Sequence, residues 1–314
     1  MTEPLKVGVI GVGYLGRFHA EKYAALPNLA LAGVADVNAE QASRVAGALH
    51  TQGFADYREL LPQVEAVSVA VPTRDHFAVV RDCLEAGLQV LVEKPLAATV
   101  AEADRLVALA RDRGLLLMVG HLERFNSAME ELKRRVTQPR FIESHRLSFF
   151  KERGTDVDVV LDLMIHDLDH LLSLVPSPVQ EIRAAGISVL TDSIDLANVR
   201  LEFADGCIAN ITASRMSFKS MRKFRLFQPD AYLAVDFEAR ELTIAARQEG
   251  ALGPLPGVAL DIKRFPPEDV LFKEITAFVD AVQHGQPSPI SGEAGRDALN
   301  LAMEIMGAMK KAKV

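Results

Sequence analysis

The sequence contains no tryptophan, only two cysteines and no apolar run that approaches the length of a membrane span. A transmembrane helix needs about 20 consecutive apolar residues, so no membrane span and no membrane partner is expected. Cys83 and Cys207 are too few and too far apart to predict a disulfide framework or a zinc site. The first apolar run starts within a few residues, which leaves no room for a signal peptide. We therefore expect a reduced, cytoplasmic protein.

Positive charge is also scarce, because 35 Lys and Arg residues face 42 Asp and Glu residues for a formal net charge of −7. A nucleic-acid surface needs clustered cations that displace counterions, so no nucleic-acid partner is expected. The remaining composition, 49% hydrophobic and 25% charged, is ordinary for a globular protein. A chain of 314 residues is long enough for two domains with full cores.

The order of predicted elements divides the chain in two. Up to about residue 120, short apolar strands alternate with helices, which is typical of a parallel sheet. Afterwards, closely spaced period-two strands dominate; the exceptions are a helix at 158–175, a Gly- and Pro-rich loop at 250–267 and two closing helices at 269–284 and 292–311. We therefore predict an α/β protein: a doubly wound parallel sheet in residues 1–122 and an α+β domain with a large open, mostly antiparallel sheet in residues 123–314.

The most informative motif lies where the first strand runs into Gly11, Gly13 and Gly16, with Tyr14 and Leu15 between the last two. Glycines at this spacing allow a tight turn, close approach of the backbone to a pyrophosphate, and packing of the following helix, whose N-terminus attracts phosphates. Asp36 ends the next apolar run about twenty residues later, where a carboxylate accepts hydrogen bonds from ribose hydroxyls and repels a 2′-phosphate. The motif predicts a dinucleotide cofactor and favours NAD over NADP.

Further candidate site residues follow three other strands of the predicted parallel sheet, where side chains point into the ligand crevice. They are Pro72, Thr73 and His76 after one strand, Glu93 and Lys94 after the next, and His121 with Arg124 after the last. A lysine in this position can hydrogen-bond a substrate hydroxyl, and Pro95 suggests a fixed, cis turn. The alternatives are an ordinary helix N-cap at Thr73 or Asp75, a solvated lysine at Lys94 and a structural hinge histidine at His121.

The helix predicted at 158–175 is mostly apolar, with one narrow polar stripe. At 100° per residue, five polar side chains fall within about 40° of Asp162; they are Asp158, Asp162, His166, Asp169 and Ser173. Asp162 and His166 are four residues apart, so the carboxylate can hold the imidazole as a general base. The alternatives are a half-buried helix with its polar stripe in solvent, and a metal site formed by Asp162, His166, Asp169 and His170. We expect no metal, because one helix face rarely supplies a full coordination shell.

At these residues the chain resembles the glucose–fructose oxidoreductase / inositol dehydrogenase / MocA family of NAD(P)-dependent sugar oxidoreductases. The matching motifs run through the whole chain in order: Gly11–Gly16 with His19 and Asp36, Val71–His76, Glu93–Pro95, Gly120–His121, Asp162–Asp169 and Pro289–Gly295. The resemblance implies that Lys94 and His166 flank the hydroxyl being oxidised, that His166 acts as the base or acid, and that Asp162 orients it. It also implies a homodimer or homotetramer formed by the second sheet.

Within this family, the segments Gly120–Asn126, Asp162–Asp169 and Thr212–Arg215 are most similar to nucleotide-sugar 3-dehydrogenases. That similarity implies a small-molecule partner, a UDP-N-acetylhexosamine oxidised at its 3-hydroxyl, with Arg124, Arg153 and Arg215 available to its diphosphate. Each of these arginines has an alternative role in a surface salt bridge. Two other functions remain open: an inositol or free-sugar dehydrogenase, and a non-catalytic NAD-binding regulator.

Overall fold

The computed structural model describes residues 3–150, 158–250 and 257–311, and the chain divides into two compact units. Met1–Leu122 and Asp269–Leu299 form the first unit, and Glu123–Glu268 and Asn300–Val314 form the second. The second domain expected from the sequence, residues 123–314, therefore includes a segment that clusters with the first unit.

Backbone pairing explains why that segment belongs to the first unit. Met118 forms an isolated antiparallel bridge with Ser291, and the N–H of Val119 donates to the carbonyl of Ile290 at 3.1 Å. An edge strand presents unpaired backbone groups, and this segment satisfies some of those on the last strand of the sheet.

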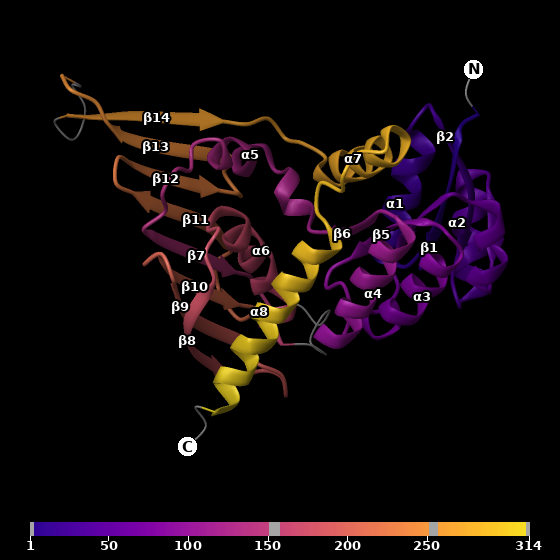
Figure 1. The fold of residues 1–314 in the computed structure, drawn as a ribbon, viewed down its shortest axis with the longest axis horizontal. Helices are drawn as coiled ribbons and strands as arrows, with labels where there is room; N and C mark the ends of the chain where they lie inside the picture. The colour runs from indigo at the N-terminus through magenta and orange to yellow at the C-terminus, as the bar shows by residue number, and fades with distance from the viewer. Residues whose placement is uncertain (1–2, 151–157, 251–256, 312–314) are drawn as a thin grey trace. The chain divides into compact units, whose positions relative to one another are not determined.

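The first unit is built on six parallel strands in the order β3-β2-β1-β4-β5-β6 (Figure 1). This is the strand order of a Rossmann fold, in which ligands bind beyond the carboxyl ends of the strands. The strands are β1 (Leu5–Ile10), β2 (Leu29–Ala35), β3 (Gln52–Phe54), β4 (Ala66–Val69), β5 (Gln89–Glu93) and β6 (Leu117–Gly120). The helices are α1 (Tyr14–Ala25), α2 (Ala39–Leu49), α3 (Thr73–Glu85), α4 (Val100–Arg113) and α7 (Val270–His284), with short 3₁₀ turns η1 (Tyr57–Glu59) and η2 (Leu61–Gln63).

Local sequence accounts for several of these boundaries. Asn38 caps α2 by accepting from the N–H of Gln41, and Thr99 and Glu102 form a reciprocal capping box at the start of α4. Gly114 and Gly285 end α4 and α7 in the left-handed conformation that glycine adopts without steric cost. Such caps satisfy backbone groups that a helix leaves unpaired at its ends.

The second unit is built on an eight-stranded sheet in the order β14-β13-β12-β11-β7-β10-β9-β8. Among the described strands of this sheet, β7 and β10 alone pair in parallel, so the sheet is mostly antiparallel, as predicted. The strands are β7 (Phe141–Leu147), β8 (Val179–Ile187), β9 (Leu196–Phe203), β10 (Ile208–Ser214), β11 (Met221–Gln228), β12 (Ala231–Asp236), β13 (Glu241–Arg247) and β14 (Val258–Arg264). The other elements are η3 (Leu122–Phe125), α5 (Ser127–Lys133), a π-helix η4 (Val160–Met164) and α6 (Ile165–Leu174). Helix α8 (Gly292–Lys311) begins in the first unit and ends in the second.

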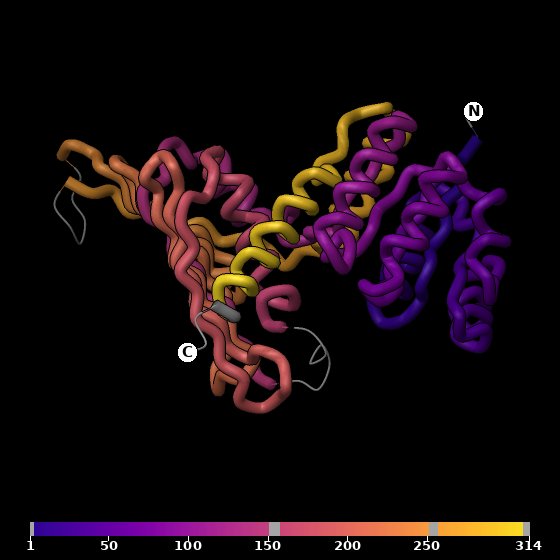
Figure 2. The backbone as a smooth tube through the Cα atoms, turned by 60° about the horizontal axis from the view of Figure 1, so that its bottom comes forward, coloured from indigo at the N-terminus to yellow at the C-terminus, as the bar shows by residue number. Residues whose placement is uncertain are grey.

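Alternate residues of this sheet face a core that the helices of the unit cover, and Figure 2 shows these helices on one side of the strands. The core packs side chains of α5, η4 and α6 against the inward residues of the strands, among them Leu132, Met164, Leu168, Phe224 and Leu226. The outward residues of the same strands are polar or partly exposed. This pattern is expected of an antiparallel sheet that is buried on one face.

Two predictions of local structure are corrected. The segment 250–267 was expected to be a loop, but it contains β14, which pairs with β13 at the sheet edge. Flanking Gly and Pro residues obscure a strand whose existence depends on a partner found only in the folded sheet. The helix expected at 158–175 begins instead as the π-helix η4 and becomes α-helical at Ile165.

In the described part of the chain, no helix has the length and hydrophobicity to cross a bilayer. Cys83 and Cys207 are buried free thiols.

Candidate functional site

The glycine loop between β1 and α1 has the shape needed to hold a dinucleotide. Gly11 has φ +84°, and a Cβ there would lie 2.8 Å from the backbone of Ala70. A Cβ on Gly16 would lie 1.7 Å from the carbonyl oxygen of Gly11, whereas Gly13 faces open space. The loop therefore turns tightly at Gly11, packs α1 closely at Gly16 and leaves room above Gly13, as a pyrophosphate site at a helix N-terminus requires.

Asp36 lies beside this loop at the end of β2. Its Oδ2 accepts a hydrogen bond from the N–H of Val12 at 2.9 Å, and its Oδ1 accepts one from the N–H of Asn38 at 2.9 Å. The side chain is half-buried. Each carboxylate oxygen has a second lone pair, so Asp36 can fix the loop and still accept hydrogen bonds from a ribose. These residues fit a dinucleotide, and they fit one without a 2′-phosphate better, because the carboxylate would repel that group.

Glu93 and Lys94 lie at the carboxyl end of β5, above a buried polar network. Glu93 Oε1 lies 3.0 Å from His19 Nε2, and Glu93 Oε2 accepts the backbone N–H of Lys94 at 3.3 Å. His19 Nδ1 in turn lies 3.0 Å from the hydroxyl of Ser68. Burial alone would raise the pKa of Glu93, but the hydrogen bond and charge of His19, with the charge of Lys94, hold it below its ordinary value. Glu93 is therefore a buried carboxylate that fixes the backbone of the half-buried Lys94.

The turn after β4 is held by His76. Its Nδ1 lies 2.8 Å from the carbonyl of Pro95, and its Nε2 lies 2.9 Å from the carbonyl of Val71. Burial lowers the pKa of His76, and a neutral imidazole donates to only one of these carbonyls. The Lys94–Pro95 peptide is cis, as predicted. His76 thus joins the loop that follows β4 to the loop that follows β5.

The other predicted cofactor residues also lie at this edge. Helix α3 begins at Thr73 with Pro72 in the cap position and no side-chain cap bond, so the alternative of Thr73 as an N-cap is not what the structure has. His121 is buried directly after β6, and its backbone N–H donates to Val119. In the first turn of α1, Tyr14 is 63% exposed beside the half-buried Leu15.

In the second unit, Asp162 and His166 lie on successive turns, and both are half-buried. Asp162 belongs to the π-helix η4, and His166 lies in the first turn of α6. A π-turn adds a residue and shifts every later side chain around the helix axis, and π-turns are frequent at functional sites. The predicted stripe therefore does not continue evenly: Asp158 precedes the helix and accepts the N–H of Ile194 at 2.8 Å, and Asp169 is buried.

A buried ion cluster fixes α6 to its sheet. The guanidinium of Arg146, on the inward face of β7, donates to both carboxylate oxygens of Glu123 at 2.6 Å and to Asp167 at 2.7 and 3.1 Å. Ser144 adds a hydrogen bond to Asp167 at 2.8 Å. Burial opposes ionisation of Glu123, but the charges of Arg146 and His166 hold its pKa well below its ordinary value. His170 Nε2 lies 3.7 Å from Glu123 Oε2, beyond hydrogen-bond distance. Arg146 and Ser144 thereby anchor Asp167, the residue that follows His166.

The three arginines predicted to contact a diphosphate have different surroundings. Arg124 forms a bidentate ion pair with Asp169, with both hydrogen bonds at 2.6 Å. Arg215 is buried directly after β10, and its backbone N–H donates to the carbonyl of Asp195 at 3.0 Å. Arg153 lies outside the described residues.

Sequence reasoning missed Glu123, Arg146, Asp167 and His170 as parts of this site. One signal was available: Ser144 and Arg146 occupy the inward, period-two positions of a strand whose neighbour Ile142 is apolar. A charged residue in such a position needs a buried partner. Among the described residues, no group of three His, Cys, Asp or Glu side chains is arranged to hold a metal ion.

Taken together, the strand order, the glycine loop and Asp36 define a Rossmann-type dinucleotide-binding protein with a second, α+β unit. Comparison with known families agrees. Residues 5–121 match the model described as an oxidoreductase family with an NAD-binding Rossmann fold, and residues 129–230 match the GFO/IDH/MocA C-terminal domain. The chain is a member of the Gfo/Idh/MocA family of oxidoreductases.

Individual relatives share nearly the whole chain. It is 40% identical to UDP-N-acetylglucosamine 3-dehydrogenase of Acidithiobacillus ferrooxidans, over 98% of this chain and 97% of the relative. A solved structure of that enzyme superposes with a TM-score of 0.93 and covers 98% of both chains. Myo-inositol 2-dehydrogenase of Thermotoga maritima is 27% identical over 95% of this chain and 94% of the relative. A scyllo-inositol dehydrogenase structure from Lactobacillus casei, at 17% identity and a TM-score of 0.81, shares the fold.

Proposed function

We propose that the protein is an NAD-dependent dehydrogenase that oxidises the 3-hydroxyl of a UDP-N-acetylhexosamine. The observation that carries this proposal is the 40% identity over 98% of the chain to a UDP-N-acetylglucosamine 3-dehydrogenase, against 27% for a myo-inositol 2-dehydrogenase. A free-sugar or inositol dehydrogenase is the alternative that the experiment below separates.

For the cofactor, we propose that Gly11, Gly13, Tyr14, Leu15 and Gly16 hold the pyrophosphate and that Asp36 binds the ribose of NAD. The fixed carboxylate of Asp36 supports the preference for NAD, since a 2′-phosphate would meet a negative charge there. Along the edge of the same sheet, the remaining contacts would come from a set of residues that follow the strands: Pro72, Thr73, His76, Glu93, Lys94 and His121. When bound, NAD takes up the hydride that leaves the sugar carbon.

For the acid–base chemistry, we propose that His166 accepts the proton of the sugar hydroxyl and that Asp162 orients its imidazole. Lys94 donates a hydrogen bond to the same oxygen, and its positive charge stabilises the negative charge that develops as the proton leaves. The buried Glu93 fixes Lys94, and the Glu123–Arg146–Asp167 cluster fixes the first turn of α6, which carries His166. Preorganised groups of this kind need little rearrangement during the reaction.

For the substrate diphosphate, we propose contacts from Arg215 and Arg153, whose guanidinium groups can bind phosphate oxygens in pairs. Arg124 already gives two hydrogen bonds to Asp169, so its role is to hold α6 while any remaining donor reaches the phosphate. Asp162, half-buried one turn before His166, would contact the sugar.

Thermal denaturation in the presence of single ligands tests the substrate and cofactor together. A ligand at about 100 times its Kd raises the free energy of unfolding by about 2.7 kcal/mol, so NAD and UDP should each raise Tm by several degrees. NADP at the same concentration should raise it less. Native mass spectrometry beforehand checks that the protein carries no tightly held NAD(H), which would hide the shift. A shift with myo-inositol and none with UDP would favour the free-sugar dehydrogenase.

We also propose that the outward face of the second sheet forms a homodimer or homotetramer. A row of apolar side chains crosses this face: Phe141 and Phe227 have ring centroids 5.9 Å apart, Phe227 and Tyr232 are 4.9 Å apart, and Leu260 is 49% exposed. Exposed apolar patches of this kind mark interaction surfaces. Phe227→Glu should therefore yield monomers in native mass spectrometry. Asp261→Asn should not, because Asp261 pairs with Ile244 and so lies on the opposite face of the sheet from Phe227. An oligomer that survives Phe227→Glu unchanged would show that another surface is used.

A further inference from the structure

Glu274 on α7 is a buried acid that the proposed chemistry does not use. Its side chain is fully buried, and neither carboxyl oxygen has a hydrogen-bond partner among the described residues. Helix α7 is docked on α1 by the pair Lys22–Asp269, at 2.6 Å, and Asp269 also caps α7 at the N–H of Phe272. A carboxylate without donors is costly in such a place, so its charge state requires an explanation.

The groups around Glu274 show which of two buried carboxyl groups, Glu93 or Glu274, carries the negative charge. The negative charge of Glu93, at the end of β5, raises the pKa of Glu274, and Glu274 likewise raises the pKa of Tyr23 on α1. Glu93 has donors, His19 Nε2 at 3.0 Å and the Lys94 N–H at 3.3 Å, whereas Glu274 has none among the described residues. The hydroxyl of Tyr23 lies 2.8 Å from that of Ser68, which contacts His19 on the other side.

Two buried carboxyl groups that repel each other do not both ionise readily, because like charges interact strongly at low dielectric. The group with donors is the one that keeps its charge. Burial, reinforced by the charge of Glu93, raises the pKa of Glu274 well above its ordinary value, while that of Glu93 is lowered. The proton of the pair therefore resides on Glu274.

We propose that Glu274, as a neutral carboxylic acid, is a positioning residue for Lys94: it leaves Glu93 as the only charged carboxylate of the pair, and Glu93 fixes the Lys94 backbone. This inference rests on the proposed catalytic role of Lys94. Ionisation of Glu274 would add a second negative charge to this buried network and weaken the hold of Glu93 on His19 and on the Lys94 N–H. The arrangement of Lys94 should then be lost at alkaline pH.

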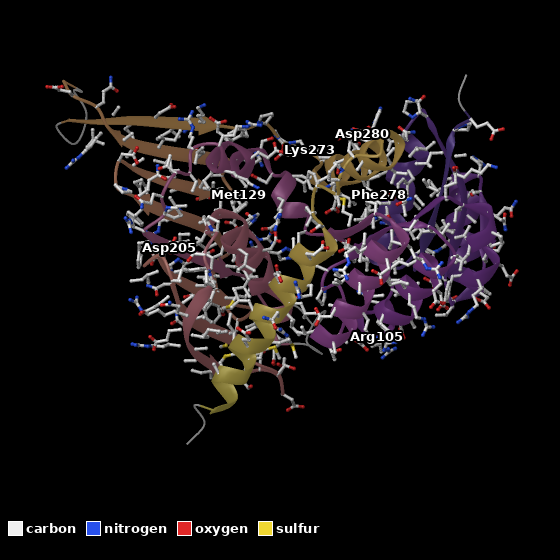
Figure 3. All side chains as sticks on the ribbon, in the orientation of Figure 1. Arg105, Met129, Asp205, Lys273, Phe278 and Asp280 are labelled. Atoms are coloured by element: carbon white, nitrogen blue, oxygen red, sulfur yellow. The ribbon has the colours of Figure 1, made fainter. Side chains whose placement is uncertain are left out.

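The first test is the pH dependence of stability of Glu274→Gln, which keeps the shape of the side chain and is always neutral. A carboxyl whose pKa is raised by folding contributes stability at low pH and loses it as the pH rises from the ordinary value to the folded-state value. The unfolding equilibrium constant of the wild type relative to the variant should therefore rise by about tenfold per pH unit within that window. Asp280→Asn, on an exposed side chain of α7 labelled in Figure 3, is the matched control and should parallel the wild type.

A superposition of the wild-type and Glu274→Gln stability curves at every pH would overturn the proposal, since Glu274 would then titrate normally. A second variant, Glu93→Gln, removes the charge that repels ionisation of Glu274. It should lower the pKa of Glu274 in the folded protein, so that the pH-dependent loss of stability ends at a lower pH than in the wild type. Infrared spectroscopy supplies an independent signature. The carbonyl band of a protonated carboxyl should be present in the wild type at neutral pH and absent in Glu274→Gln; equal bands in both would contradict the proposal.

The link to Lys94 is tested by the pH profile of kcat. Glu274→Gln should lose the alkaline decline that ionisation of Glu274 imposes on the wild type, with KM for the nucleotide sugar unchanged within about twofold. Identical profiles would overturn the positioning role even if Glu274 is protonated. A wild type that oxidises no nucleotide sugar would contradict the proposed function instead, and the stability and infrared measurements distinguish that failure from a failure of the Glu274 assignment.

Discussion

Replacing Lys94 by methionine is expected to lower kcat by about 10²–10³-fold, the loss typical when a group that stabilises developing charge is removed. Replacing His166 by glutamine removes the general base and should cost about 10²–10⁴-fold. The affinity for NAD, measured by titration calorimetry, should fall far less than kcat in both variants, because the glycine loop and Asp36, which we propose hold the pyrophosphate and the ribose, remain intact. Steady-state kinetics with a UDP-N-acetylhexosamine provide the rates.

Matched substitutions separate this chemistry from a general effect of losing a basic residue. Lys6→Met removes an exposed lysine at the start of the first sheet, and His284→Gln alters an exposed histidine near the end of α7. Both should retain the wild-type rate. A Lys94 or His166 variant that also kept a rate near that of the wild type would show that the catalytic assignment is wrong.

The Arg146→Met variant should unfold far more easily than the wild type. The substitution leaves Glu123 and Asp167 buried without the guanidinium that pairs with both. Breaking a buried pair in this way typically costs about 3–5 kcal/mol, measurable by urea denaturation. Arg225→Met is the control, because Arg225 pairs with Glu143 at a partly exposed position, where such pairs contribute about 0–1 kcal/mol.

The sign of the pH dependence provides a further check on Arg146. The pKa of Glu123 is depressed in the folded protein, so its contribution is present above the ordinary glutamate pKa and is lost as the pH falls toward the folded-state value. The stability difference between wild type and Arg146→Met should therefore narrow at acidic pH, where the abandoned carboxylates become protonated. A difference that is constant from neutral to acidic pH would indicate lost packing rather than unpaired charge.

Features that depend on neighbours along the chain could be predicted from the sequence. The turn at Gly11 and the close packing at Gly16 follow from the backbone and steric limits of those positions, and the capping residues of α2 and α4 set their boundaries. The alternation of strands with helices predicted the parallel sheet, and period-two runs predicted most strands of the second sheet. The position of Asp36 beside the glycine loop follows from its place at the end of the next strand.

Features that depend on distant residues were decided by the tertiary structure. Strand β14 forms by pairing with β13. The segment 269–299 belongs to the first unit, where Ser291 and Ile290 pair with the backbone of β6. Arg124 forms its ion pair with Asp169, 45 residues away in the sequence, a contact that only the folded chain reveals. Local sequence sets backbone conformation and periodicity, whereas the charge of a buried group such as Glu93 or Glu274 depends on which donors and charges folding brings beside it.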